Sequence, residues 1–380
     1  MNAPGIDERQ DRFHESHAAG MRLVIDLLVG HLRSLEIECD GRRLTPLYTA
    51  PWVDDRSITD DESTAANLRF LSGDFFCAPF GSAGEEGVPP HGWPANSRWD
   101  HLETIAHPEG GSVARYALRK RPNGARLVKE LTLRDGHPFV YQRHVFEGGT
   151  GTITVASHAI TQFATRGRLS FSPKSYAETP ARPLEPDPAR GRYALAYPAR
   201  FTNLGQAPLR DGGTTDLGAY PIASRHEDFV MLVEAPGSRL GWAAAMRDDA
   251  ADIVLSLKNP ADFPVTMLWF SNGGRDYPPW NGRNVGVLGI EEGRAWSANG
   301  YAASAAPNPL SQSGVPTVLE LDPNGTAEIR HVIGGLPRPD GWTEITCIGI
   351  EGDTLTLRDV SGDSRSIPFD PSFLDQPRSM

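Results

Sequence analysis

The clearest strand pattern in the chain runs from residue 112 to residue 163 and reads SVARYALRKRPNGARLVKELTLRDGHPFVYQRHVFEGGTGTITVASHAITQF. Apolar and polar residues alternate through most of it, which is the period of a β-strand with one buried face. Asn123-Gly124 and Asp135-Gly136 separate successive alternating segments, and such pairs favour tight hairpin turns. The stretch therefore predicts four consecutive antiparallel strands, over 112–120, 125–134, 137–147 and 151–163.

The same pattern continues on both sides of this stretch. Further strands are predicted over 21–29, 32–39, 43–48, 229–234, 241–246, 253–258, 265–271, 317–322 and 327–333. The 39 glycines and 32 prolines are spread along the whole chain. They suit many short strands joined by turns, and a helical protein of this size would not tolerate so many helix-breaking residues. The chain is therefore predicted to be all-β, with large antiparallel sheets.

Three segments depart from the strand pattern. Residues 1–20 form a polar N-terminal lead-in, in which a short helix is the alternative to loose chain. Residues 172–222 are rich in proline, glycine and polar residues, and a connection of that length usually serves or covers a site. Residues 336–380 are expected to be a small C-terminal β extension, packed on a main domain that comprises 21–335.

Composition excludes several functions. The net charge of −11 argues against nucleic acid, which requires a concentrated basic face. The three cysteines show neither zinc-type spacing nor a disulfide framework, and no His/Asp/Glu grouping has metal-ligand spacing, so no metal or cofactor is expected. No apolar run reaches the ~20 residues of a membrane helix, and the N-terminus lacks an apolar signal core. The prediction is a cytoplasmic protein without membrane partners.

Three motifs carry a family resemblance. GDFFCAPFG at 73–81 is followed by His91-Gly92-Trp93; TITVASH at 152–158 ends in a histidine; and VLGIE at 287–291 ends in a glutamate. In this order they resemble the aldose 1-epimerase (galactose mutarotase) superfamily, and the first motif is most similar to its hexose-6-phosphate epimerase-like branch. The resemblance covers roughly residues 20–333 and implies a β-supersandwich with a sugar cleft on one face.

The resemblance also implies a reaction and its residues. Aldose anomers interconvert when a base removes the proton of the C1 hydroxyl and an acid protonates the ring oxygen, so one base and one acid suffice. By resemblance Glu291 is the base, His158 is the acid, and His91 orients the sugar.

Other residues are predicted to bind substrate because aromatic rings stack on sugars and polar side chains bind hydroxyls. Each has an alternative interpretation, since an aromatic ring is more often core packing and Asp74 could cap a turn. The predicted set is Trp93, Asp74, Arg69, Arg275 and Trp280, with Trp269 and Tyr277 as further stacking candidates.

Departures from the branch pattern bear on the substrate. Leu71 and Ala95 stand where the sugar-phosphate branch tends to have arginines, which favours an unphosphorylated sugar or sugar derivative. Two alternatives remain at this stage: a carbohydrate-binding protein without catalysis, and a different isomerase or lyase reaction on the same scaffold. The expected partner is a small carbohydrate, and a homodimer is left open.

Overall fold

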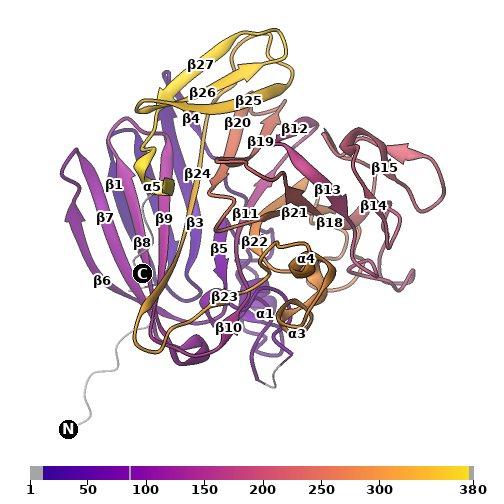
Figure 1. The fold of residues 1–380 in the computed structure, drawn as a ribbon, viewed down its shortest axis with the longest axis horizontal. Helices are drawn as coiled ribbons and strands as arrows, with labels where there is room; N and C mark the ends of the chain where they lie inside the picture. The colour runs from indigo at the N-terminus through magenta and orange to yellow at the C-terminus, as the bar shows by residue number, and fades with distance from the viewer. Residues whose placement is uncertain (1–11, 85–86, 376–380) are drawn as a thin grey trace.

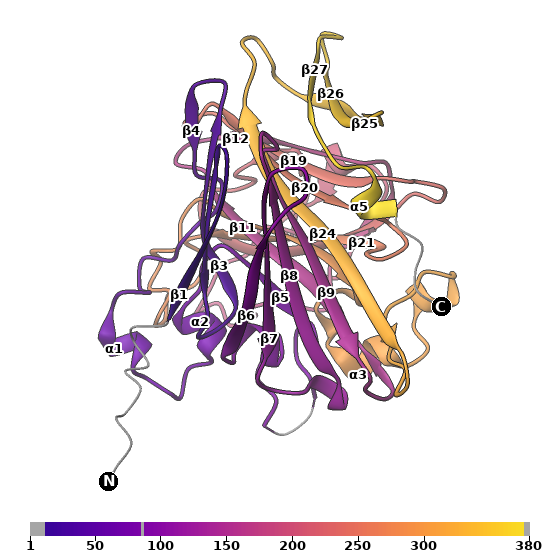
Figure 2. The ribbon, with the colours of Figure 1, turned by 90° about the vertical axis from the view of Figure 1, so that its left-hand side faces the viewer.

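The computed structural model describes residues 12–84 and 87–375, which form two large stacked sheets (Figures 1 and 2). The first sheet has eleven strands. Ten follow one another across the sheet: β1 (Phe13–Ala18), β2 (Met21–Asp26), β3 (His31–Cys39), β5 (Asp74–Cys77), β11 (Val155–Gln162), β22 (Val287–Arg294), β21 (Val265–Asn272), β18 (His226–Glu234), β13 (Lys174–Glu178) and β14 (Arg200–Phe201). The eleventh, β4 (Arg42–Leu44), pairs with β3.

The second sheet has nine strands and contains most of the hairpins predicted around residues 112–163. Pairing in both sheets is antiparallel, as in β8–β9 and β11–β22. Across the second sheet the order is β17 (Ala219–Tyr220), β12 (Gly167–Phe171), β19 (Gly241–Arg247), β20 (Asp252–Lys258), β24 (Thr326–Pro337), β9 (Phe139–Glu147), β8 (Arg126–Arg134), β7 (Gly111–Leu118) and β6 (Trp99–Ala106).

The main core lies between the two sheets because alternate side chains of each strand point to opposite faces. At one end, Leu23 and Phe76 of the first sheet share an apolar cluster with Tyr116 and Leu131 of the second. At the other end, Ile290 belongs to a similar cluster. The outer face of the first sheet carries a separate apolar cluster, and this face holds the site described below.

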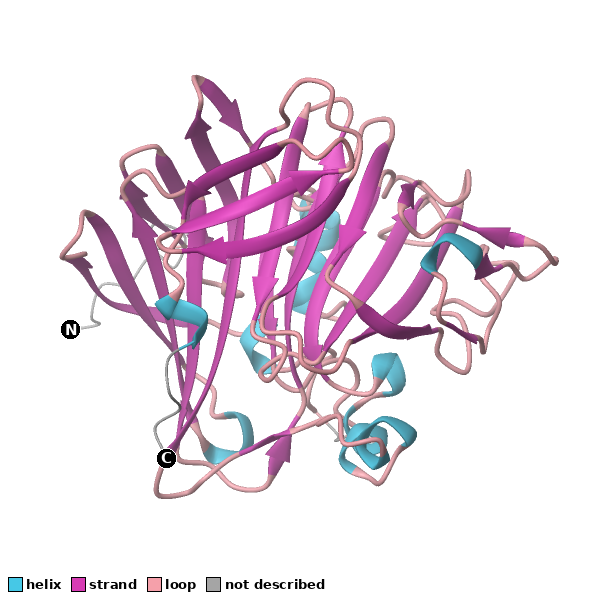
Figure 3. Ribbon diagram, turned by 45° about the horizontal axis from the view of Figure 1, so that its top comes forward, coloured by secondary structure: helices cyan, strands magenta, loops and turns pink. Residues whose placement is uncertain are grey.

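Smaller elements surround the sheets. Three C-terminal strands lie across the strands of the large sheets in Figure 3, and Leu357 and Ile367 share an apolar cluster there with Trp242 and Leu255. These strands are β25 (Ile345–Glu351), β26 (Thr354–Asp359) and β27 (Ser364–Pro368). The remaining elements are β10 (Thr152–Ile153), β23 (Leu319–Glu320), β15 (Ala207–Pro208), β16 (Thr214–Thr215), α1 (Arg56–Thr59), α2 (Ala66–Arg69), α3 (Tyr301–Ala305), α4 (Pro309–Gln312), α5 (Ser372–Asp375), η1 (Trp93–Ala95), η2 (Pro122–Gly124), η3 (Leu204–Gln206) and η4 (Ser297–Asn299).

The all-β prediction is confirmed, but two local predictions need correction. The lead-in over 1–20 was expected to be loose chain or a short helix, whereas 13–18 form strand β1 paired with β2; residues 1–11 lie outside the described part of the chain. Strand β6, over 99–106, was not predicted. It is an edge strand with mostly exposed side chains, so it lacks the alternation of a half-buried strand.

Charged side chains are buried between the two sheets, on the inner face of the first sheet. Lys258, which is fully buried, contacts Glu234 at 3.0 Å and Glu292 at 2.5 Å. Lys174 also pairs with Glu234, and Thr266 donates a hydrogen bond of 2.7 Å to Glu292. Because a buried charge is costly unless it is paired, Lys258 of β20 holds the second sheet against two carboxylates of the first, whereas Lys174 joins β13 to β18 within the first sheet.

Replacing Lys258 by Met is therefore expected to lower the free energy of unfolding by about 3–5 kcal/mol, since two carboxylates would remain buried near each other. Urea denaturation measures the change. The control is Arg56→Ala, which removes an exposed pair with Asp60 and should change stability by less than about 0.5 kcal/mol. A Lys258→Met variant as stable as the control would contradict this account of the interior.

Candidate functional site

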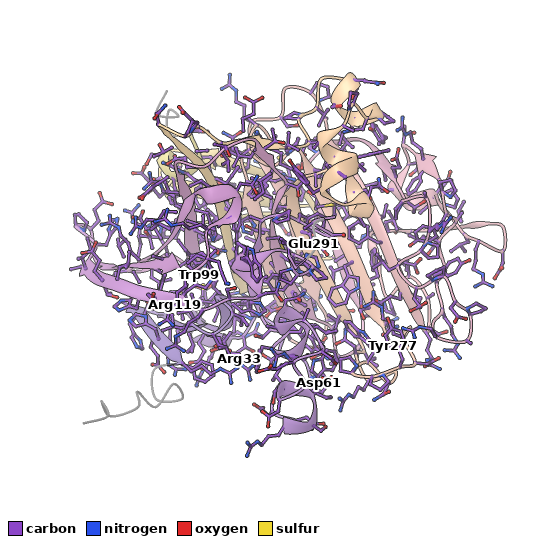
Figure 4. All side chains as sticks on the ribbon, turned by 90° about the horizontal axis from the view of Figure 1, so that it is seen from below. Arg33, Asp61, Trp99, Arg119, Tyr277 and Glu291 are labelled. Carbon is purple, nitrogen blue, oxygen red and sulfur yellow. The ribbon has the colours of Figure 1, made fainter. Side chains whose placement is uncertain are left out.

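Five neighbouring strands of the first sheet form the floor of the candidate site. Their registers place Phe229 of β18 opposite Trp269 of β21, Glu291 of β22 opposite His158 of β11, and His158 opposite Phe75 of β5. All five side chains line one cavity on the outer face of the sheet. A polar pair thus lies in the middle of the floor, with aromatic rings on either side. Figure 4, seen from below, shows Glu291 in the middle of the molecule.

The polar pair is in direct contact. His158 Nε2 lies 3.0 Å from Glu291 Oε1, and both side chains are nearly buried. The other ends of the two groups, His158 Nδ1 and Glu291 Oε2, are buried without a protein partner. The His158 ring stacks on Phe75 at 4.5 Å. Gly289 makes room for it, because a Cβ there would lie 3.0 Å from His158 Cε1 and 3.1 Å from the ring of Trp269.

His91 reaches the same cavity from a tight loop. Its backbone has φ of 64°, and the next residue, Gly92, has φ of 70°. A Cβ on Gly92 would lie 2.0 Å from the carbonyl oxygen of Ala78, so the turn requires glycine. Asn96 donates hydrogen bonds of 2.8 Å to the carbonyls of Pro90 and Gly92 and fixes the loop.

The His91 ring lies edge-on to the His158 ring and contacts the thiol of Cys77. Its centroid is 5.7 Å from that of His158, and its Nδ1 is 3.4 Å from Cys77 Sγ. Burial raises the pKa of Cys77 well above the ordinary thiol value, so the thiol keeps its proton and can donate it to Nδ1. The arrangement directs His91 Nε2 away from the thiol.

The buried carboxylate of Glu227 contacts two residues that line the cavity, Trp269 and Arg275. Glu227, 1% exposed, accepts hydrogen bonds from Trp269 Nε1 and from Ser271 Oγ, and lies 3.3 Å from the Arg275 guanidinium. Arg275 in turn lies over the Trp280 ring at 4.5 Å. Burial raises the pKa of Glu227, and the nearby Arg275 opposes this shift.

The cavity has a volume of about 340 Å³, which is within the range of small-molecule sites. Most of its wall is apolar, and polar side chains project from only a few positions. The lining residues are Ala65, Asn67, Leu68, Leu71, Phe75, Phe80, Gly81, Ser82, Pro90, His91, His158, Leu184, Phe229, Trp269, Arg275, Trp280, Glu291 and Ala298.

The structure brings together most, but not all, of the residues predicted from sequence. Those that line the cavity are Glu291, His158, His91, Arg275, Trp280 and Trp269. Tyr277 does not line it; its ring packs on Arg190 at 4.0 Å.

Three predicted substrate-binding residues lie elsewhere. Asp74 points between the sheets, where its carboxylate accepts a 2.5 Å hydrogen bond from Gln142. Trp93 lines a separate cavity of about 350 Å³, and Arg69 donates to the carbonyl of Thr59 at 2.8 Å. Side chains alternate between the two faces of a strand, and in β5 it is Phe75, not the neighbouring Asp74, that faces the cavity.

Sequence reasoning missed Glu227, Asn67 and Leu184. Glu227 precedes the strand predicted over 229–234, whereas β18 already begins at His226. Alternation from Phe229 back along that strand would have placed Glu227 on the cavity face. Asn67 and Leu184 lie outside predicted strands, and no local pattern marks them.

The described residues show neither a metal-binding cluster nor a helix that could span a membrane. No cluster of three or more His, Cys, Asp or Glu side chains is arranged there to hold a metal ion. None of the helices in the described part of the chain has the length and apolar character needed to cross a bilayer.

Solved structures of other proteins share this fold, although the sequences are only distantly similar. No protein-family model and no curated protein matches the sequence. Solved structures do match: a galactose mutarotase-like protein from Lactobacillus casei has 12% identity and a TM-score of 0.53, over 85% of this chain and 99% of that one. A candidate aldose 1-epimerase from Escherichia coli K12 has 11% identity and a TM-score of 0.55, over 85% and 98%.

A galactose mutarotase related enzyme from Lactobacillus acidophilus matches similarly, with 10% identity and a TM-score of 0.52, over 86% of this chain and 98% of that one. The chain therefore has the galactose mutarotase-like fold, and the resemblance predicted from the three motifs is confirmed in its architecture.

His31, which packs on Phe75 of the cavity floor, is expected to make the stability of the protein depend on pH. His31 stacks on the face of Phe75, and burial lowers the pKa of His31 to about 3. The unfolded chain binds a proton near pH 6.5, so this contribution to stability is present above pH 6.5 and is lost as the pH falls towards 3. At pH 5 the loss from His31 alone is about 2 kcal/mol.

The measurement is denaturant unfolding at pH 7 and pH 5 for wild type and His31→Gln. The variant is expected to lose about 2 kcal/mol less than wild type over this interval. His17→Gln, on an exposed side chain, serves as the control and should follow the wild type. Equal pH dependence in His31→Gln and wild type would contradict the assignment.

Proposed function

We propose that the protein is an aldose 1-epimerase-like enzyme that interconverts the anomers of an unphosphorylated sugar or sugar derivative. The observation that carries the proposal is the 3.0 Å contact of His158 with Glu291 in the middle of the cavity floor. An acid and a base for this reaction must act on two oxygens bonded to the same carbon, C1. Side chains already in contact with each other are suitably close to reach both.

In the proposed reaction Glu291 removes the proton of the C1 hydroxyl while His158 protonates the ring oxygen. The bond between C1 and the ring oxygen breaks and a C1 aldehyde forms. After rotation about C1–C2, the oxygen of the C5 hydroxyl attacks the other face of the aldehyde, and both protons return. Each positioned proton transfer contributes typically 10²–10⁴-fold, so one pair suffices and no redox step is involved.

Other cavity residues bind and orient the sugar in this proposal. Trp269 and Trp280 offer ring faces for stacking, and His91 offers a ring nitrogen. Arg275 is the one arginine among the described lining residues, and its partner is Glu227. Because its charge is already compensated, the cavity suits a neutral ligand better than a phosphate. Position 71, which lines the wall, holds a leucine and not an arginine, and this also supports an unphosphorylated substrate.

The test is anomer exchange measured by NMR on a panel of aldoses. Glu291→Gln and His158→Gln are each expected to lower the rate constant by about 10²–10⁴-fold, because each removes one proton transfer. Glu320→Gln, on an exposed side chain of β23, is the matched control and should retain the wild-type rate.

Two results would contradict the proposal. One is wild-type protein that exchanges no sugar faster than buffer; saturable sugar binding in that case would favour a carbohydrate-binding protein. The other is a Glu291→Gln variant as active as the wild type, which would move the base elsewhere.

A further inference from the structure

The thiol of Cys77 contacts a residue of the cavity without lining the cavity itself. Cys77 ends β5 and lies two residues after Phe75, on the same face of the strand. Phe75 lines the cavity, whereas Cys77 is fully buried and does not. The Cys77 sulfur lies 3.4 Å from His91 Nδ1, and no second hydrogen-bond partner of this thiol occurs in the described part of the chain. Cys77 can therefore act on a bound ligand only through His91.

The position of the proton in this contact follows from the donors and acceptors present. Burial raises the pKa of Cys77 well above the ordinary thiol value, and burial, assisted by His158, lowers the pKa of His91 to about 3. At neutral pH a protonated thiol therefore meets a neutral imidazole, which carries a proton on only one of its two nitrogens. If the thiol donates to Nδ1, both groups are satisfied. If Nδ1 donates to the sulfur, a weak acceptor is used and the buried S–H has no acceptor of its own, which is the less favourable arrangement.

The Nε2 side of the His91 ring is the side available to a ligand. His91 lines the cavity, and Nδ1 is the ring nitrogen that contacts the protein. Neighbouring rings hold the imidazole edge-on, with centroid distances of 5.9 Å to Phe75, 5.5 Å to Phe80 and 5.7 Å to His158. Asn96 fixes the loop that carries the ring. The protein thus sets the orientation of His91 and, through the thiol, which nitrogen is protonated.

We propose that Cys77 is a positioning residue for substrate binding: its thiol donates to His91 Nδ1, keeps the imidazole proton on Nε2, and so makes His91 a hydrogen-bond donor to an oxygen of the sugar. The inference rests on the proposed anomer interconversion and adds how His91 recognises the substrate. Hydroxyl and ring oxygens of a sugar all carry lone pairs, so each can accept from this nitrogen. A hydrogen bond that orients the sugar in the ground state and in the transition state alike affects KM more than kcat.

The nitrogen chemical shifts of the His91 imidazole test the proton arrangement directly. The protein is prepared with isotope-labelled histidine, and His91→Phe identifies the His91 resonances by their loss. At pH 7 the wild type is expected to show an unprotonated Nδ1 and a protonated Nε2. Cys77→Ala should move the Nδ1 shift, because that nitrogen loses its donor. A proton on Nδ1 of the wild type, or protons on both nitrogens, would overturn this inference and leave the proposed function standing.

Anomer exchange kinetics test whether the thiol acts through His91. Cys77→Ala is expected to raise KM by about 3- to 10-fold and to leave kcat within about 2-fold, because it removes one hydrogen bond that holds His91. Cys77→Ser restores a donor and should bring KM back to within about 2-fold of the wild type. In a His91→Phe background, Cys77→Ala should change KM by less than about 2-fold, because the effects of two coupled residues are not additive.

Cys39→Ala is the matched control. Cys39 is partly buried on β3 and does not line the cavity, so this variant should keep the wild-type KM. Circular dichroism verifies that all variants fold. An unchanged KM in Cys77→Ala, or an equal rise in KM with and without His91, would overturn the inference. Exchange of no sugar by the wild type would overturn the proposed function and, with it, the sugar contact of His91, whatever the nitrogen shifts show.

Discussion

The structure depends on the opposite directions taken by two consecutive carboxylates of β22. Glu291 faces the cavity and contacts His158, whereas Glu292 faces the interior between the sheets and contacts Lys258. Strand alternation separates the two charges without any change in the backbone. The inner ion pair holds β22 against the second sheet, and the outer contact brings the Glu291 carboxylate against the His158 imidazole. One strand therefore carries both an interior ion pair and the proposed acid/base pair.

Much of the fold could be predicted from the sequence because the main signals are local. Alternating residues and Asn-Gly or Asp-Gly turns define strands β7 to β9, and the three motifs lie on or beside three elements that meet at the site. The edge strand β6 was missed because its side chains are exposed on both faces. Partners far apart in sequence, such as Glu292 and Lys258, leave no local pattern.

The site was predicted less completely, for two physical reasons. A motif identifies neighbours in sequence, but alternation sends them to opposite faces, so Asp74 lies between the sheets while Phe75 lines the cavity. The loop that presents His91 turns Trp93 towards a different cavity. Glu227 was hidden because the start of its strand was placed three residues late. His158 and Glu291, the two predicted catalytic candidates, do line the cavity, and each ends a strand-like motif of the sequence.

The proposed reaction requires particular atoms of the sugar to meet Glu291 and His158, and a crystal structure with a bound aldose shows which atoms do so. The anomeric oxygen is expected within hydrogen-bond distance of the Glu291 carboxylate and the ring oxygen within hydrogen-bond distance of His158. A sugar bound in this cavity with C1 turned away from both residues, or bound only in the cavity beside Trp93, would contradict it.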